Sequence, residues 1–134
     1  MKVEHVPLEW VTRTWEGVKD YIASAVEFGK GDYTIDQIRG YVSQGHWDML
    51  IAVDGGVIHG VATMHVYNRP NDRVALVTTA GGKMISNEGT FSQVKSYAAS
   101  RGATVIECAA RDSASRLFKR LGFEEKYRIL GVKL

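Results

Sequence analysis

Hydrophobic positions near the start of the chain repeat with the period of an α-helix. Between residues 7 and 28 they fall three or four positions apart, which places them along one stripe of a helix. They are Val11, Trp15, Val18, Ile22 and Val26. Pro7 suits the first turn, where its missing N–H costs no hydrogen bond, and the segment GKGD, residues 29–32, ends the helix. The pattern predicts a helix over residues 7–28.

A second, shorter helix is predicted from its capping residues. Thr34 followed by Gln37 has the form of a capping box, in which each side chain bonds the backbone N–H of the other residue. Ile38, Tyr41 and Val42 are expected to supply the buried side, and Gly45 ends the helix.

After Gly45 the pattern changes from helical to extended. Residues 47–53 form a short apolar run, and the Asp-Gly-Gly turn that follows leads into a second extended run at residues 57–67. The turn-forming segment NRPND separates this run from a third, at residues 73–79. Extended runs joined by such short turns pair as antiparallel neighbours, so the sequence predicts a three-strand meander.

The second half of the chain alternates between strands and helices. The stretch TTAGGKMIS, residues 78–86, is expected to turn on its two glycines and start a third helix, which Gly102 ends. Residues 104–110 then read as a strand, a fourth helix starts at Asp112 or Ser113, and Gly122 ends it. Residues 123–134 are expected to add one or two final strands. The sum is an α+β fold with a mixed, mostly antiparallel sheet.

Composition is that of an ordinary globular protein. The chain has 134 residues, of which 45% are hydrophobic and 24% charged, so we expect residues 1–134 to form a single domain. No apolar run approaches the roughly 20 residues that cross a bilayer, and the start of the chain lacks the apolar stretch of a signal peptide. Cys108 is the only cysteine, which favours a reducing, cytoplasmic setting and excludes both an intrachain disulfide and a two-cysteine zinc site.

The charge pattern argues against nucleic acid as a partner. The net charge is +2, and the basic residues are scattered except in one group near the fourth predicted helix. A nucleic-acid surface needs a broader basic face with exposed aromatic side chains between the cations. The basic group is also what the solvated face of an amphipathic helix looks like.

The segment SASRLFKRLGFEE, residues 113–125, resembles the GCN5-related N-acetyltransferases, whose last helix and strand commonly carry an alanine, a leucine-aromatic pair and a glycine-phenylalanine end. The order of elements agrees with that family over nearly the whole chain. Residues 31–56 look like divergent acetyltransferase-like proteins of tailed bacteriophages. This second resemblance implies a phage or prophage origin, and hence the host cytoplasm.

The family resemblance implies acetyl-CoA as cosubstrate and a primary amine as acceptor. In the family, pantetheine lies where the strand before the glycine turn splays from its neighbour, and loop amides bind the pyrophosphate. The positions that correspond here are Gly81, Gly82, Lys83 and Met84. Only the middle glycine of the family pattern survives, which implies that pyrophosphate binding is weaker or needs a shifted loop. We expect Gly82→Glu to weaken binding without unfolding the protein.

The catalytic set implied by the resemblance is incomplete. Phe118 stands where many members place a tyrosine that protonates the departing thiolate, and Arg111 stands where an asparagine is common. A phenyl ring has no proton to give, and a positioned acid is worth about 10²–10⁴-fold in rate. The catalytic residues therefore stay unassigned.

Other polar residues offer candidate replacements, each with a structural alternative. His59 and His65 lie six apart on one predicted strand, about 20 Å, so they cannot share a metal and suit a polar strand face; no metal site is expected. Glu107 or Cys108 could face the substrate, although a lone cysteine is more often a small core residue. Tyr127, on a predicted closing strand, could donate a proton.

Two functions remain open. The first is an N-acetyltransferase that passes an acetyl group from acetyl-CoA to a primary amine. The alternative is a binding or structural protein that keeps the fold without turnover and serves phage assembly or a host interaction. Phe118 and the eroded glycine pattern favour the alternative.

Overall fold

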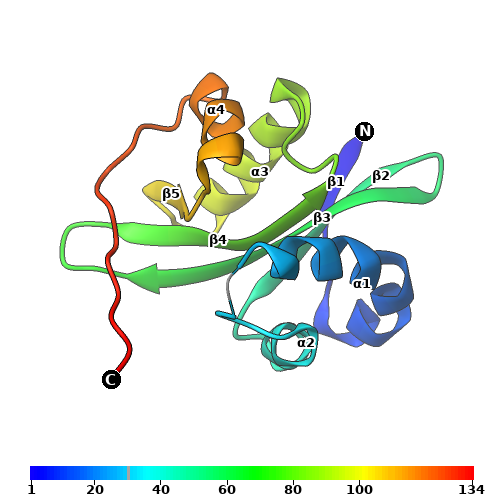
Figure 1. Ribbon diagram of the computed structural model, residues 1–134. Helices are drawn as coiled ribbons and strands as arrows, with labels where there is room; N and C mark the ends of the chain where they lie inside the picture. Colours follow the sequence, from blue (N-terminus) through cyan, green and yellow to red (C-terminus); the bar gives the residue numbers. More distant parts are fainter. Residues whose placement is uncertain (30) are drawn as a thin grey trace.

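The computed structural model describes residues 1–29 and 31–134. It has the predicted α+β architecture, with four α-helices and an open five-strand sheet whose order follows the sequence, β1-β2-β3-β4-β5. The strand pairs are antiparallel except β4 and β5, which are parallel. Figure 1 shows α1 and α2 on one face of the sheet and α3 and α4 on the other.

The N-terminal helices form where the hydrophobic pattern predicts them. A single 3₁₀ turn, Leu8–Trp10, precedes α1 at Val11–Glu27, and α2 spans Ile35–Ser43. The capping box of α2 is confirmed, because the Gln37 N–H donates to Thr34 Oγ1 over 3.1 Å and the Thr34 N–H donates to Gln37 Oε1 over 2.9 Å. The sequence predicted that residues 29–32 end this first helix, and Lys30 within that segment lies outside the described residues.

The meander is confirmed as β2 at Asp48–Asp54, β3 at Val57–Asn68 and β4 at Arg73–Gly82. α3 spans Glu88–Ser100, β5 spans Val105–Cys108 and α4 spans Asp112–Arg120. One hydrophobic cluster lies between the sheet and the first two helices, and a second lies on the α3 face.

The structure corrects the sequence-based prediction in three places. An additional strand, β1 at Lys2–His5, pairs with β2. The glycine pair belongs to β4 rather than to a turn, since Gly81 pairs with Val61 and Gly82 with Gly60. The turn follows at residues 83–87, and Asn87 caps α3 by accepting the Thr90 N–H over 2.7 Å.

The third correction concerns the end of the chain. Residues 123–134 form no helix or strand, although the sequence predicted one or two closing strands there. In the part of the chain that the structure describes, no strand pairs with this segment. A strand needs such a partner for its backbone hydrogen bonds.

Candidate functional site

The sheet opens on one side of β4. The parallel ladder with β5 runs from the pair Val74 and Val105 to the pair Val77 and Cys108 and ends there. β4 itself continues for five more residues, of which the last four, Thr79 to Gly82, remain paired with β3 on the other side. Among the described residues no strand pairs with this second half of β4 on the β5 side. Residues 78–82 therefore present a free strand edge beside the end of β5.

A β-bulge marks the point where this opening begins. Thr63 of β3 pairs with Thr79, and the next residue, Met64, pairs with Val77, so Thr78 is an extra residue in β4. The hydroxyl of Thr63 is hydrogen-bonded to the hydroxyls of both Thr78, at 2.7 Å, and Thr79. A bulge leaves its extra residue out of the ladder and bends the strand. It therefore turns β4 at the position where β5 leaves it.

Positions 81 and 82 require glycine because other backbone segments pass close to them. A Cβ atom at Gly81 would lie 2.6 Å from the carbonyl oxygen of Tyr21 in α1. A Cβ atom at Gly82 would overlap the carbonyl oxygen of His59, and the φ angle of Gly82, +64°, is one that side chains disfavour. Packing between α1, β3 and β4 therefore accounts for both glycines.

Lys83 and Met84 complete the predicted phosphate-binding segment. The Lys83 N–H donates to the carbonyl of His59 over 2.8 Å, so that amide already has a partner. The Lys83 side chain is exposed, whereas Met84 is fully buried in the cluster on the α3 face. The Lys83 ammonium group therefore places an exposed positive charge at this end of β4.

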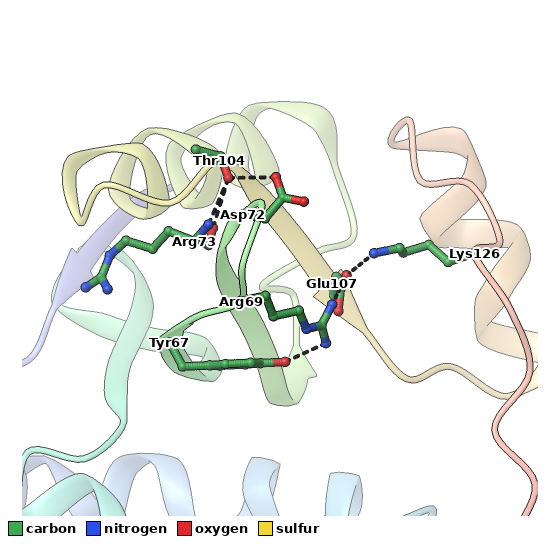
Figure 2. A network of polar contacts seen from close by, with 7 residues as sticks. All are labelled: Tyr67, Arg69, Asp72, Arg73, Thr104, Glu107 and Lys126. Atoms are coloured by element: carbon green, nitrogen blue, oxygen red, sulfur yellow. Dashed lines mark hydrogen bonds and ion pairs between the residues drawn. The ribbon is translucent and has the colours of Figure 1, made fainter.

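Glu107 in β5 is held by two cations (Figure 2). Arg69, from the turn between β3 and β4, donates to Glu107 Oε2 over 2.7 Å and to the hydroxyl of Tyr67 over 2.6 Å. Lys126 contacts the same carboxylate oxygen. The hydrogen bond from Arg69, and secondly the one from Lys126, lowers the pKa of Glu107. Partial burial acts in the opposite direction and raises it. Glu107 is thus an ionised carboxylate whose charge is already neutralised.

The same turn is tied to the start of β5. The Arg73 N–H donates to Thr104 Oγ1 over 3.0 Å, and the Thr104 hydroxyl donates to Asp72 over 2.9 Å (Figure 2). These bonds hold β5 against the first half of β4. The two strands therefore stay together at this end and separate only beyond Val77.

Cys108 is the last residue of β5 and borders the opening. Burial, and secondly the nearby charge of Glu107, raises the pKa of its thiol to about 11. The thiol is therefore protonated at neutral pH. Because the thiolate is the nucleophilic form, this cysteine is unsuited to covalent catalysis.

The two positions at which the catalytic set departs from the family pattern lie around α4. Phe118 is 8% exposed and packs edge-on against Phe123 with the ring centroids 5.1 Å apart. Its side chain is therefore part of a hydrophobic contact. Arg111, just before α4, lies with its guanidinium carbon 3.4 Å from the centroid of Phe28, at the end of α1. This cation–π contact joins helices from opposite faces of the sheet.

The remaining candidates are not gathered at the opening. His65 lies among aromatic side chains, 5.0 Å from Tyr67 and 6.4 Å from Trp47 between ring centroids. His59 lies at a register shift in β3. Tyr127 lies in the C-terminal segment and is 63% exposed. No group of three potential metal-binding side chains occurs among residues 1–29 and 31–134.

Sequence reasoning missed the threonine cluster and Arg69. Arg69 lies in NRPND, whose composition predicts only a turn, and its partner is 38 residues away. The threonines carry a weak signal, since Thr78 and Thr79 are adjacent polar residues at the end of an apolar strand. None of the helices in the described part of the chain is long and apolar enough to cross a membrane.

Comparison with known proteins relates the fold to acetyltransferases. No family model and no curated protein matches the chain. A ribosomal-protein-alanine N-acetyltransferase from Brucella melitensis biovar Abortus 2308 has a similar structure, with a TM-score of 0.71 at 12% identity over 100% of both chains. An aminoglycoside acetyltransferase from an uncultured soil metagenomic sample, in complex with sisomicin, gives 0.73 at 11% identity over 99% of this chain and 95% of the other.

A third similar structure includes a ligand. It is a predicted acetyltransferase with acetyl-CoA from Clostridium acetobutylicum, with a TM-score of 0.68 at 13% identity over 98% of this chain and 95% of the other. At such low identities the likeness shows a shared fold. It agrees with the fold expected from the resemblance of residues 113–125.

Proposed function

We propose that this protein is an N-acetyltransferase that transfers the acetyl group of acetyl-CoA to a primary amine. The observation that carries the proposal is the opening of the sheet at Thr78, where β4 continues without β5. Backbone N–H and C=O groups on a free strand edge need partners. The pantetheine arm of acetyl-CoA is an extended chain with two amide groups, which suits such an edge.

The proposed pyrophosphate site remains the segment Gly81, Gly82, Lys83 and Met84. Gly82 and Lys83 are exposed at the end of the free edge, and the Lys83 ammonium group supplies a positive charge for an anion. The Lys83 amide is bonded to His59, so it would have to exchange that bond to contact a phosphate. We therefore assign the Lys83 side chain the larger share of the attraction.

Chemistry at this site would rely on positioning. The amine nitrogen forms a bond to the acetyl carbon, the carbon–sulfur bond breaks, the amine proton goes to solvent, and the thiolate of coenzyme A takes a proton from solvent. Holding two reactants in line supplies rate without an acid or base. Phe118 has no proton to donate, and the protonated thiol of Cys108 argues for direct transfer without an acyl-cysteine. We expect a slow enzyme.

A binding protein without turnover is the second candidate. It is favoured by the buried phenyl ring of Phe118 and by the ion pairs that occupy Glu107. Such a protein would bind acetyl-CoA or a related acyl-CoA and release no thiol.

Calorimetric titration with acetyl-CoA, followed by a thiol-release assay with a mixture of primary amines, distinguishes these functions. Ala110 is exposed and lies two residues after the end of β5, so Ala110→Trp adds an indole close to the point where the two strands separate. The matched control is Ser96→Trp on the exposed side of α3. We expect Ala110→Trp alone to weaken binding. Binding with thiol release supports the enzyme, binding without release supports the second candidate, and no binding at millimolar acetyl-CoA refutes the enzyme.

A further inference from the structure

The threonine cluster, defined here as Thr63, Thr78 and Thr79, lies on one face of the sheet at the bulge of β4. Thr63 pairs directly with Thr79, so their side chains project to the same side, and the hydroxyl of Thr78 reaches that of Thr63 there. Val61, two residues before Thr63, belongs to the hydrophobic cluster under the first two helices. Since alternate strand residues share a face, the three hydroxyls lie on the side of α1 and α2.

The threonine cluster is polar where valine would pack equally well. Thr63 is 0% exposed and Thr79 is 9% exposed. Valine has the shape of threonine and the same preference for strands. Burying a hydroxyl requires a hydrogen-bond partner, which a methyl group does not. Packing alone therefore gives no reason for three hydroxyls at this place.

The three hydroxyls hold one proton more than their mutual hydrogen bonds use. Thr63 Oγ1 contacts Thr78 Oγ1 and Thr79 Oγ1, and among the described residues these hydroxyls have no other hydrogen-bond partner. Each hydroxyl has one proton, so two protons lie in the two bonds and the third is free. A buried donor without an acceptor is costly, so the free donor belongs to Thr78, the most accessible of the three. The bonds therefore run from Thr79 to Thr63 and from Thr63 to Thr78.

The length of the free edge places Thr78 beside the sulfur of a bound coenzyme. From Lys83 back to Thr78 the chain covers five residues, about 17 Å of strand. The pantetheine arm has about 13 bonds between phosphorus and sulfur, and about 1.2 Å of extension per bond gives about 16 Å. An arm that starts at Lys83 and follows the edge therefore ends with its sulfur level with Thr78.

The other polar groups near this end of the opening are poor donors. Glu107 is ionised and bonded to two cations, so it has no proton to offer. The thiol of Cys108, at the end of β5, is a weak hydrogen-bond donor. Phe118 has no proton to give. The hydroxyl of Thr78 is thus the strongest free donor that the described side chains bring to the place where the strands separate.

We infer that Thr78 is a catalytic residue whose hydroxyl donates a hydrogen bond to the sulfur of coenzyme A as the thiolate leaves. The inference rests on the proposed function and adds a donor to its chemistry. The amine nitrogen bonds to the acetyl carbon, the carbon–sulfur bond breaks, and the electron pair stays on sulfur. Thr78 keeps its proton, because an alcohol is a far weaker acid than a thiol, and solvent later protonates the thiolate. Thr63 and Thr79 are positioning residues that direct the Thr78 proton toward the opening.

Two measurements on the product complex test the inference. Calorimetry shows whether coenzyme A binds, and ultraviolet titration of the complex then gives the pKa of the bound thiol. A donor to the thiolate lowers this pKa because it stabilises the charged form. We expect the pKa of bound coenzyme A to be about 1–2 lower on the wild type than on Thr78→Val. The complex with desulfo-coenzyme A is the blank, and the only protein thiol, Cys108, titrates separately because burial raises its pKa to about 11.

The variants separate the hydroxyl of Thr78 from the shape of its side chain. Thr78→Val keeps the shape and removes the donor, whereas Thr78→Ser keeps the donor and should keep the lower pKa. Thr63→Val lets the Thr78 hydroxyl turn and should raise the pKa by less. Thr12→Val, on the exposed side of α1, is the matched control and should leave the pKa unchanged. In turnover, kcat of Thr78→Val should fall about 10- to 100-fold with little change in KM.

The outcomes distinguish this inference from the function on which it rests. If millimolar coenzyme A does not bind, the proposed function is overturned and the inference with it. If coenzyme A binds and its thiol has the same pKa on the wild type and Thr78→Val, the inference alone is overturned. An equal rise of the pKa on Thr78→Ser and Thr78→Val would also overturn it, because shape rather than the hydroxyl would then be responsible.

Discussion

Replacing Gly60 with alanine tests the close approach of the segment after β4 to β3. A Cβ atom at Gly60 would lie 2.6 Å from the Met84 nitrogen and 2.9 Å from both the Gly81 oxygen and the Lys83 nitrogen. All three are backbone atoms, so no side-chain rotation relieves the overlap. The residues after β4 must move away, and the bond from the Lys83 N–H to His59 is weakened or lost.

The size of the effect follows from these two terms. Overpacking of a closed site costs about 1–3 kcal/mol, and the strained hydrogen bond adds about 1 kcal/mol. We therefore expect Gly60→Ala to reduce the free energy of unfolding by about 2–4 kcal/mol. At roughly 3–4 °C per kcal/mol for a protein of this length, Tm should fall by about 6–16 °C.

Gly40→Ala is the matched control, because a Cβ atom there meets nothing within 4 Å and the residue lies inside α2. Alanine should stabilise that helix by about 0.5–1 kcal/mol. Urea and thermal unfolding followed by circular dichroism measure both variants. An unchanged Tm for Gly60→Ala would show that the segment after β4 does not pack on β3 as described.

This packing also corrects the expectation for Gly82→Glu. At φ +64° and in overlap with His59, any side chain at this position is strained. The substitution should destabilise the protein, so weakened ligand binding by that variant would say nothing about a phosphate site. Lys83→Ala is the better variant, since its side chain is exposed.

Three further outcomes are expected. The pKa of Glu107 is lowered in the folded state, so its ion pairs with Arg69 and Lys126 stabilise the protein above the ordinary carboxyl pKa, and this stabilisation is lost as pH falls through the lower folded pKa. Tm of Glu107→Gln should therefore fall less on acidification than Tm of the wild type. Parallel curves of Tm against pH for the two proteins would contradict the assignment. Iodoacetamide should modify Cys108 slowly at neutral pH and faster only as pH approaches about 11; rapid labelling at neutral pH would show an activated thiol. Tyr97→Phe removes the 2.7 Å hydrogen bond from the hydroxyl to Asp48 and should cost about 1 kcal/mol in urea unfolding, whereas Ser96→Ala on the exposed side of α3 should cost little.

Local patterns predicted the elements that have strong local signals. The apolar stripe of α1 and the capping box at Thr34 depend on residues three or four positions apart, and both were read correctly. β1 was missed because it is a four-residue edge strand with three exposed residues, so it lacks a hydrophobic alternation. The closing strands were predicted from a pattern that finds no strand partner among the described residues.

The candidate site was predictable only in part. The local sequence around α4 pointed to Phe118 and Arg111, and the strand before it to Cys108. The glycine pair was placed in a turn because the reason for it, the approach of Tyr21 and His59, comes from residues distant in sequence. The bulge at Thr78 and the pair between Arg69 and Glu107 likewise depend on register and on long-range contacts.

The most direct test of the central claim is to map the contact site of acetyl-CoA by amide chemical shifts of the labelled protein during a titration. If the opening between β4 and β5 holds the pantetheine arm, the largest shifts should fall on residues 78–83 and on residues 109–111, with those of β1 and β2 unchanged. Saturating shifts confined to other elements, or no shifts at millimolar acetyl-CoA, would contradict the claim.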